Sequence, residues 1–303
     1  MMKSTPHYRG RFAPSPTGPL HFGSLVAAVG SYLEARSRKG EWLLRMEDID
    51  PPREVAGAAD SILHGLEHLG MYWDDAVLYQ SHRYGAYDQA LAKLEQAGHT
   101  YLCSCSRAEI FKYAVMTDDG PIYSGACRGG VNKQQASYAI RVRVNDGYIG
   151  FEDHVQGRIG QHLEQEVGDF VLRRADGLPA YQLAVVVDDA MQGITHVVRG
   201  CDLLNASLRQ VYLQSLLGLA HPRYLHLPVV VNDKGEKLSK QTFAAPLDQN
   251  RPVAELCKAL VFLGQDPPVS LSEASVDEFW VWAIAHWQLS RVPRQRQIAY
   301  SGL

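Results

Sequence analysis

Three things are scarce in this chain of 303 residues: long apolar runs, an excess of one charge, and cysteine. No apolar run approaches the ~18–20 residues that cross a bilayer, and the first residues, MMKSTPHYRG, lack the apolar stretch of a signal peptide. We therefore expect a cytoplasmic protein that does not associate with membranes. The net charge is −3, which argues against a non-specific binder of nucleic acid but leaves room for a local basic strip such as RVPRQRQ (291–297).

Cysteine occurs five times, an odd number. Cys103, Cys105 and Cys127 are clustered, whereas Cys201 and Cys257 stand alone and indicate no role. In a chain without an export signal, clustered cysteines more often bind a metal than form disulfides. The alternative is three unbound cysteines.

Three thiolates need one further donor to complete a tetrahedral zinc site. Two residues qualify: His99 precedes the Cys-Ser-Cys pair, and Tyr123 lies four positions before Cys127. Tyrosine is an uncommon ligand, so spacing alone favours the histidine. We expect a structural site, because the pattern shows no open catalytic position.

The first part of the chain alternates strand and helix patterns. This alternation predicts a parallel α/β sheet. The predicted strands are YRGRFAP (8–14) and WLLRMEDID (42–50), and the predicted helices are 25–40, 56–70 and 84–98.

The alternation of strand and helix patterns stops after residue 99. Residues 100–168 read as an inserted mixed or antiparallel module with a period-two strand, YAIRVRV (138–144). Strands then return, among them the near-continuous apolar run LAVVVDD (183–189), which predicts a strand buried on both faces. Further predicted elements are a helix at 205–218, a strand at 224–232 and helices at 253–264 and 276–289. The expected units are two halves of one catalytic domain (1–99 and 169–245), the insert (100–168) and a short helical unit (246–303).

A constrained loop, RFAPSPTGPLHFGS (11–24), stands directly before the first helix. Free backbone N–H groups at a helix N-terminus favour phosphate. His21 is suited to donate a hydrogen bond to phosphate as charge builds up, and Gly23 lets a flat base approach the backbone. The alternative is a proline-glycine turn with a capping histidine.

A second segment, KGEKLSKQTF (234–243), carries three lysines around one glycine and follows a predicted strand. Lysines on a mobile loop suit a triphosphate, because they can follow charge onto the leaving pyrophosphate. Taken alone, the segment is better interpreted as a surface lysine loop.

HFGS and KLSK together resemble the two signatures of class I aminoacyl-tRNA synthetases, usually written HIGH and KMSKS. The likeness continues through LLRMEDIDPPR and the run Y-x-L-A-V-V-V-D-D…G-I-T-H-V-V-R-G-x-D-L-L. In order and spacing these segments resemble glutamyl-tRNA synthetases over about the first 245 residues. The resemblance implies a Rossmann-type catalytic domain with an inserted zinc-containing α+β module.

The resemblance also implies an activity, the formation of glutamyl-adenylate from L-glutamate and Mg-ATP. It assigns catalysis to His21 and Lys240, and less strongly to Lys237; Gly23 and Ser24 would join His21 and Lys240 in binding ATP. The glutamate pocket would comprise Arg11, Phe12, Ala13, Pro14, Ser15, Glu47, Tyr181 and Arg199. Glu47 would hold the ammonium group, and Arg199 the side-chain carboxylate, since a guanidinium fork matches a carboxylate bidentately. The alternatives are a cap carboxylate for Glu47, a surface ion pair for Arg199 and a core position for Tyr181.

Residues 246–303 are too few for an anticodon-binding domain. In this the chain resembles short paralogues of glutamyl-tRNA synthetases, which transfer glutamate to queuosine at the wobble position of tRNA(Asp). Those paralogues carry C-x-C…Y-x-x-x-C in the insert, which favours Tyr123 as the fourth ligand of one zinc ion. Two alternatives are a short enzyme that charges the tRNA 3′ end and a catalytically silent tRNA-binding paralogue. We expect a monomer.

Overall fold

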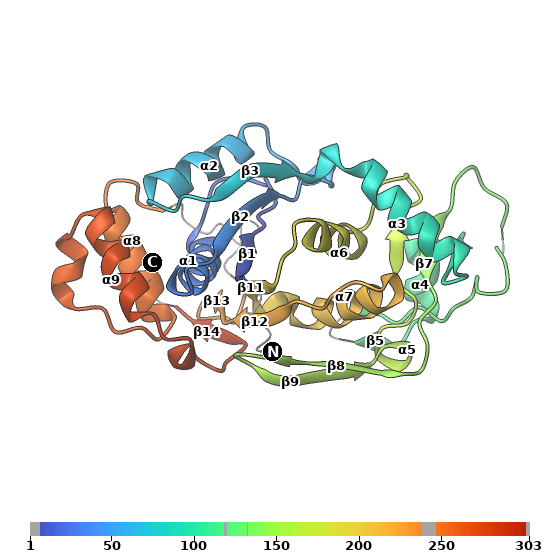
Figure 1. Cartoon of the computed structure of the whole chain (residues 1–303). Coiled ribbons are helices and arrows are strands. Elements are labelled where there is room, and N and C mark those ends of the chain that lie inside the picture. Colours follow the sequence, from blue (N-terminus) through green and yellow to red (C-terminus); the bar gives the residue numbers. More distant parts are fainter. Residues whose placement is uncertain (1–6, 118–119, 132, 238–246, 301–303) are drawn as a thin grey trace, which may run out of the picture.

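The computed structural model describes residues 7–117, 120–131, 133–237 and 247–300. At its centre, parallel strands from both halves of the chain lie side by side (Figure 1). Thr195 joins the two halves, because its amide donates to the carbonyl of Arg9 at 2.9 Å. The prediction of a parallel α/β sheet is confirmed. The strands are β1 (Arg9–Phe12), β2 (Glu41–Met46) and β3 (Asp74–Tyr79) in one set, and β11 (His196–Gly200) with β12 (Arg223–Leu227) in the other.

Helices cover this sheet and connect its strands. Helix α1 follows β1 and packs closely against the sheet, because a Cβ at Gly30 would lie only 2.5 Å from the Leu227 side chain. Tertiary packing of this kind supplies most of a helix's stability. The helices of the two halves are α1 (Phe22–Ser37), α2 (Ala58–His68), α3 (Tyr84–Gln96), α6 (Tyr181–Met191) and α7 (Leu204–Leu217).

One predicted strand was wrong. The run LAVVVDD belongs to helix α6, not to a strand. Its apolar residues Leu183–Val187 are all buried because the helix packs against α3, α7 and β10 (Val171–Arg173). A short apolar run buried on every side has no periodicity that separates strand from helix, so its β-branched composition misled the prediction.

The insert forms an antiparallel sheet of β4 (Thr100–Cys103), β7 (Ala139–Val142) and β10, which follows residue 168. A hairpin of β8 (Tyr148–Asp153) and β9 (Gly157–His162) leaves this sheet and runs beneath α7 (Figure 1). Its β8 pairs with β12 at Asp153 and Tyr224, so the insert reaches the edge of the parallel sheet. The remaining short elements are α4 (Arg107–Tyr113), α5 (Leu163–Glu166), β5 (Met116–Thr117) and β6 (Gly120–Pro121).

The C-terminal helices share one apolar core with α1 and the parallel sheet. Helices α8 (Pro252–Phe262) and α9 (Val276–His286) confirm the helical pattern and pack on α1. The Trp287 indole donates to the Glu34 carboxylate at 2.7 Å, across this interface. The basic strip RVPRQRQ leads into β14 (Gln297–Ala299), which pairs with β13 (Val229–Val231). Within the described ranges, no helix combines the length and apolar character needed to cross a bilayer.

Candidate active site

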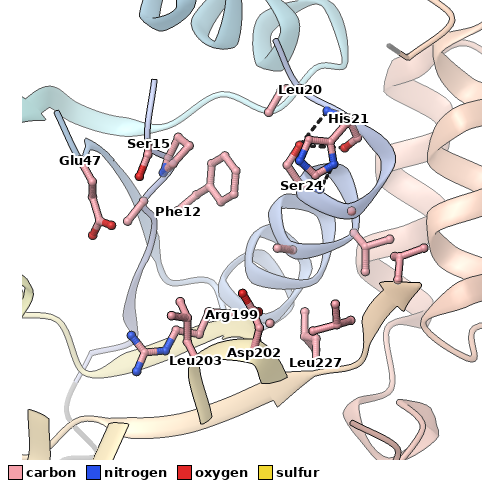
Figure 2. A pocket seen from close by; sticks show the side chains of 18 of the residues that line it. Phe12, Ser15, Leu20, His21, Ser24, Glu47, Arg199, Asp202, Leu203 and Leu227 are labelled. Atoms are coloured by element: carbon pink, nitrogen blue, oxygen red, sulfur yellow. Dashed lines mark hydrogen bonds between the residues drawn. The ribbon is translucent and has the colours of Figure 1, made fainter. Parts of the chain in front are cut away.

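A cavity of about 500 Å³ opens at the carboxyl ends of β1, β2 and β11. Ligands of open α/β sheets bind at this edge. Figure 2 shows Glu47 and Arg199 toward one end of the cavity and His21 with Ser24 toward the other. The lining includes every residue predicted for the site that the structure describes: Arg11, Phe12, Ala13, Pro14, Ser15, His21, Gly23, Ser24, Glu47, Tyr181, Arg199 and Lys237.

His21 is the N-cap of α1 as well as a lining residue. The amide of Ser24 donates to His21 Nδ1 at 3.3 Å, and the amide of His21 donates to Ser24 Oγ at 2.8 Å (Figure 2). Because Nδ1 accepts a hydrogen bond, the neutral ring carries its hydrogen on Nε2. The capping alternative and the phosphate-donor hypothesis are therefore compatible, since the cap fixes the ring through the opposite nitrogen.

Arg199 is a buried cation whose hydrogen bonds, among the described residues, all go to neutral groups. Its Nε donates to His226 Nε2 at 3.2 Å, and its second terminal nitrogen donates to Ser207 at 2.7 Å and Gln210 at 2.8 Å. The other terminal nitrogen lies 3.4 Å from the Tyr181 hydroxyl. A buried charge is costly unless an opposite charge compensates it. Arg199, at 6% exposed, lines the cavity and is therefore suited to an anionic ligand.

Arg11 differs from Arg199, because it already has a counter-charge. Its Nε lies 3.0 Å from one oxygen of Asp189, and fully buried Arg45 lies 2.8 Å from the same oxygen. Burial works to raise the pKa of Asp189, but the two guanidinium groups hold it below its ordinary value. Arg11 thus shapes the pocket with much of its charge already neutralised.

Glu47 follows β2 directly and faces the cavity (Figure 2). Its amide donates to the carbonyl of Pro14 at 3.0 Å, which ties the ends of β1 and β2 together. Burial raises the pKa of the Glu47 carboxyl, although Arg45, 3.5 Å away, Arg11 and Arg199 oppose the shift. A cation bound beside this carboxylate would compensate its desolvation.

Lys237 also lines the cavity. Its ammonium group lies 2.6 Å from the carboxylate of Asp202, and both side chains are substantially exposed. An exposed pair of this kind is weak. Lys240, the other predicted lysine, lies outside the described residues.

The cysteine cluster lies in the insert, where β4 ends. The three sulfurs are within 4.8 Å of one another, and Cys105 Sγ is 3.5 Å from Cys127 Sγ. The Tyr123 hydroxyl lies 3.3 Å from Cys103 Sγ and 3.4 Å from Cys105 Sγ. The prediction that these cysteines could hold a metal is supported by this grouping.

The donor set of the cluster fits zinc. A tetrahedral ion with Zn–S bonds of ~2.3 Å places its sulfurs about 3.8 Å apart, close to the observed spacing. Burial would raise the pKa of Cys127, but hydrogen bonds from Tyr123 and Ser104 lower it to about 6, toward the thiolate that metals bind, whereas burial raises the pKa of Cys105 to about 11. The Arg141 guanidinium lies 3.9 Å from the Tyr123 ring centre and supplies positive charge. His99 is not among the grouped ligands of the described chain.

Sequence reasoning missed several polar residues behind the cavity. Asp189 stood inside the run interpreted as a strand, so its role in holding Arg11 and Arg45 had no signal. Asp153 and His226 are 73 residues apart and carry no motif, yet they meet behind Arg199. Asp202 stands in the GITHVVRGCDLL run and could have been noted as the acidic partner of a lysine.

Comparison with known proteins identifies the class. Residues 7–255 match the family model of tRNA synthetases class I (E and Q), catalytic domain. The crystal structure of a glutamate-tRNA synthetase from Elizabethkingia anophelis superimposes with a TM-score of 0.78 at 26% identity, covering 98% of this chain and 68% of that one.

Curated relatives narrow the family further. The chain is 58% identical over 293 residues to the glutamyl-Q tRNA(Asp) synthetase of Dechloromonas aromatica, covering 96% of this chain and 97% of the relative. It is 54% identical to the protein of that name from Chromobacterium violaceum, covering 94% and 95%. The chain therefore belongs to the glutamyl-Q tRNA(Asp) synthetase family of class I tRNA synthetases.

Proposed function

We propose that this chain activates L-glutamate with Mg-ATP and transfers the glutamyl group to queuosine in tRNA(Asp). The observation that carries the proposal is Arg199, a buried cation in the cavity whose hydrogen bonds all go to neutral groups among the described residues. The side-chain carboxylate of glutamate would give this guanidinium a directly bonded counter-charge. Glutamine, which is neutral, would not. Family membership supports the same substrate class.

The substrate's remaining groups have partners along the cavity. Glu47 would receive the α-ammonium group, whose positive charge would keep this buried carboxylate ionised. Tyr181 would contact the same substrate beside Arg199. The segment Arg11–Ser15 would form the wall of the pocket. The free α-carboxylate would then point along the cavity toward His21.

Activation needs little covalent work from the protein. A carboxylate oxygen of glutamate attacks the α-phosphorus of ATP, the bond to the bridging oxygen breaks, and pyrophosphate leaves with its electron pair. His21, Gly23 and Ser24 at the start of α1 would bind phosphate, with His21 donating from Nε2. Lys237 and Lys240 would follow the charge onto pyrophosphate.

In the second step a hydroxyl of the queuosine cyclopentenediol attacks the glutamyl carbonyl. The hydroxyl proton is lost, the acyl–phosphate bond breaks and AMP leaves, so one ester bond replaces one mixed anhydride. A cis-diol on the modified base resembles the ribose diol that an ordinary synthetase acylates.

We also propose that Cys103, Cys105, Cys127 and Tyr123 hold one structural zinc ion. The ion would crosslink β4 to the segment around residues 123–127 and so fix the insert. It lines no part of the cavity described above, and we assign it no chemical step.

The test uses labelled glutamate, ATP, and tRNA(Asp) prepared with and without queuosine. We expect label only on the queuosine-containing tRNA, in a form that survives removal of the 3′-terminal adenosine. Label on that adenosine, or labelling independent of queuosine, would contradict the proposal and favour a short enzyme that charges the 3′ end.

A further inference from the structure

Behind Arg199, on the side away from the cavity, lies a chain of buried polar groups that the proposed reaction does not use. His226 Nδ1 is 2.6 Å from a carboxylate oxygen of Asp153, and both side chains are fully buried. His226 Nε2 is 3.2 Å from Arg199 Nε and 3.0 Å from Ser207 Oγ. Buried polar networks are costly unless each member is satisfied, so this one needs a reason.

The direction of each hydrogen bond in this series follows from the two groups at its ends, the Asp153 carboxylate and the Arg199 guanidinium. An ionised carboxylate only accepts and a guanidinium only donates. His226 must therefore donate from Nδ1 to Asp153 and accept at Nε2 from Arg199. The amides of Val155 and Gln156 both donate to the other Asp153 oxygen, Oδ1, at 3.0 and 2.8 Å, which holds the carboxylate in place.

His226 is neutral in this arrangement. Burial lowers its pKa to about 4, against the opposing effect of the Asp153 carboxylate. A neutral ring with its hydrogen fixed on Nδ1 presents a lone pair to Arg199. The other tautomer, or a protonated ring, would set one N–H against another and turn the guanidinium away.

The residues of this hydrogen-bonded series come from three different strands. Arg199 stands on β11, His226 on β12 and Asp153 at the end of β8, which belongs to the insert. Asp153 is paired with Tyr224 at the point where the insert joins the parallel sheet. The hydrogen-bonded series behind the guanidinium thus ends on a residue of the insert.

We propose that Asp153 and His226 are positioning residues that orient Arg199 and thereby set the preference for a side-chain carboxylate over an amide. The inference rests on the proposed function, because it concerns how the same pocket selects glutamate. Neither residue lines the cavity, so both act only through Arg199.

Two substitutions at one position separate this role from simple packing. His226→Asn can keep an N–H toward Asp153 but has no acceptor for Arg199, whereas the longer His226→Gln can place its carbonyl oxygen near the position of Nε2. Glutamate-dependent ATP–pyrophosphate exchange is measured for both, with glutamine as competing substrate and thermal melting in parallel.

For His226→Asn we expect the KM for glutamate to rise by about tenfold to a hundredfold, the value of a lost hydrogen bond to a charged group. Selectivity over glutamine should fall, and the KM for ATP should stay unchanged. His226→Gln should restore much of the glutamate KM, and Asp153→Asn should fall between the two.

Unchanged glutamate KM and selectivity in His226→Asn would overturn the proposal. So would equal losses in both variants that affect glutamate and ATP alike and follow a lower melting temperature. The wild-type reaction checks the proposed function separately: no exchange with glutamate would remove that function, whereas normal wild-type exchange with unaffected variants would remove only the positioning role.

Discussion

The two ends of the cavity are built differently. At the glutamate end, Arg11 and Arg199 are buried, Glu47 is largely buried, and all three are held by partners on several elements. At the phosphate end, the local cap of α1 holds His21, and Lys237 rests in an exposed pair with Asp202. The first end suits recognition of one rigid pattern of charge, and the second suits charge that moves during the reaction.

We expect the largest loss of activity when the positive charge of Arg199 is removed from the glutamate end. Arg199→Ala should lower kcat/KM for glutamate on the order of a hundredfold to a thousandfold, since loss of one partner of a buried ion pair costs about 3–5 kcal/mol. The KM for ATP should change little. Pyrophosphate exchange measures both. Arg199→Lys is the matched control, and it should recover only part of the loss because lysine lacks the fork.

The phosphate end should show graded effects instead. Lys240→Ala should leave glutamate binding nearly intact and slow adenylate formation on the order of a hundredfold, as expected for lost stabilisation of transition-state charge. Lys237→Ala should slow it about tenfold or less, because this lysine is exposed and already paired with Asp202. Single-turnover adenylate formation gives both numbers. Equal and large losses in glutamate affinity would show that the two ends are not separate.

The cysteine cluster lies outside the cavity, so its loss should affect stability and not adenylate formation. Cys127→Ser should release zinc, measured by atomic absorption, and lower the melting temperature by roughly 5–10 °C, the equivalent of a few kcal/mol. Adenylate formation should persist, because the cluster lines no part of the cavity. Cys257→Ser, outside the cluster, is the control and should retain zinc. Retained zinc in Cys127→Ser would remove this residue from the ligand set.

The smallest expected effect is on stability in mild acid. Burial lowers the pKa of His196 and of His226 to about 4. Both histidines therefore stay neutral in the folded protein at pH 5, whereas in the unfolded chain they take up protons below about pH 6.5. Stability should therefore fall as pH drops from 7 to 5, by on the order of 1–3 kcal/mol. Glu47, whose pKa burial raises, works in the opposite direction. Urea unfolding at both pH values measures the change.

A flat profile would contradict the neutral state of these histidines. His226→Gln removes one of the two groups and should make the acid loss smaller. The carboxylates with lowered pKa, such as Asp153 and Asp189, add their own losses only in more acidic solution, below the ordinary pKa of aspartate near 4.

Much of the fold followed from the sequence because most elements carry a periodic pattern. Helix α1 and strand β2 appear close to where their patterns predicted them. Helix α6 does not, because packing on all sides removed its helical period and left a run that reads as a strand. Tertiary context decided that segment, and no local signal revealed it.

The lining of the site could be predicted only through the resemblance to glutamyl-tRNA synthetases. Spacing alone did not decide whether His21 caps a helix or donates a hydrogen bond to phosphate. The structure shows that it caps α1 and also lines the cavity. The partners behind Arg199 could not be predicted in either way. Asp153 and His226 come from separate strands, and only the folded sheet brings them together.

We propose that Arg199, which is buried and hydrogen-bonds only to neutral groups among the described residues, selects the side-chain carboxylate of glutamate. A crystal structure with a non-hydrolysable glutamyl-adenylate analogue tests it most directly. We predict the side-chain carboxylate within hydrogen-bond distance of Arg199 and the phosphate beside His21. A carboxylate bound elsewhere, with Arg199 still facing only neutral groups, would contradict the account.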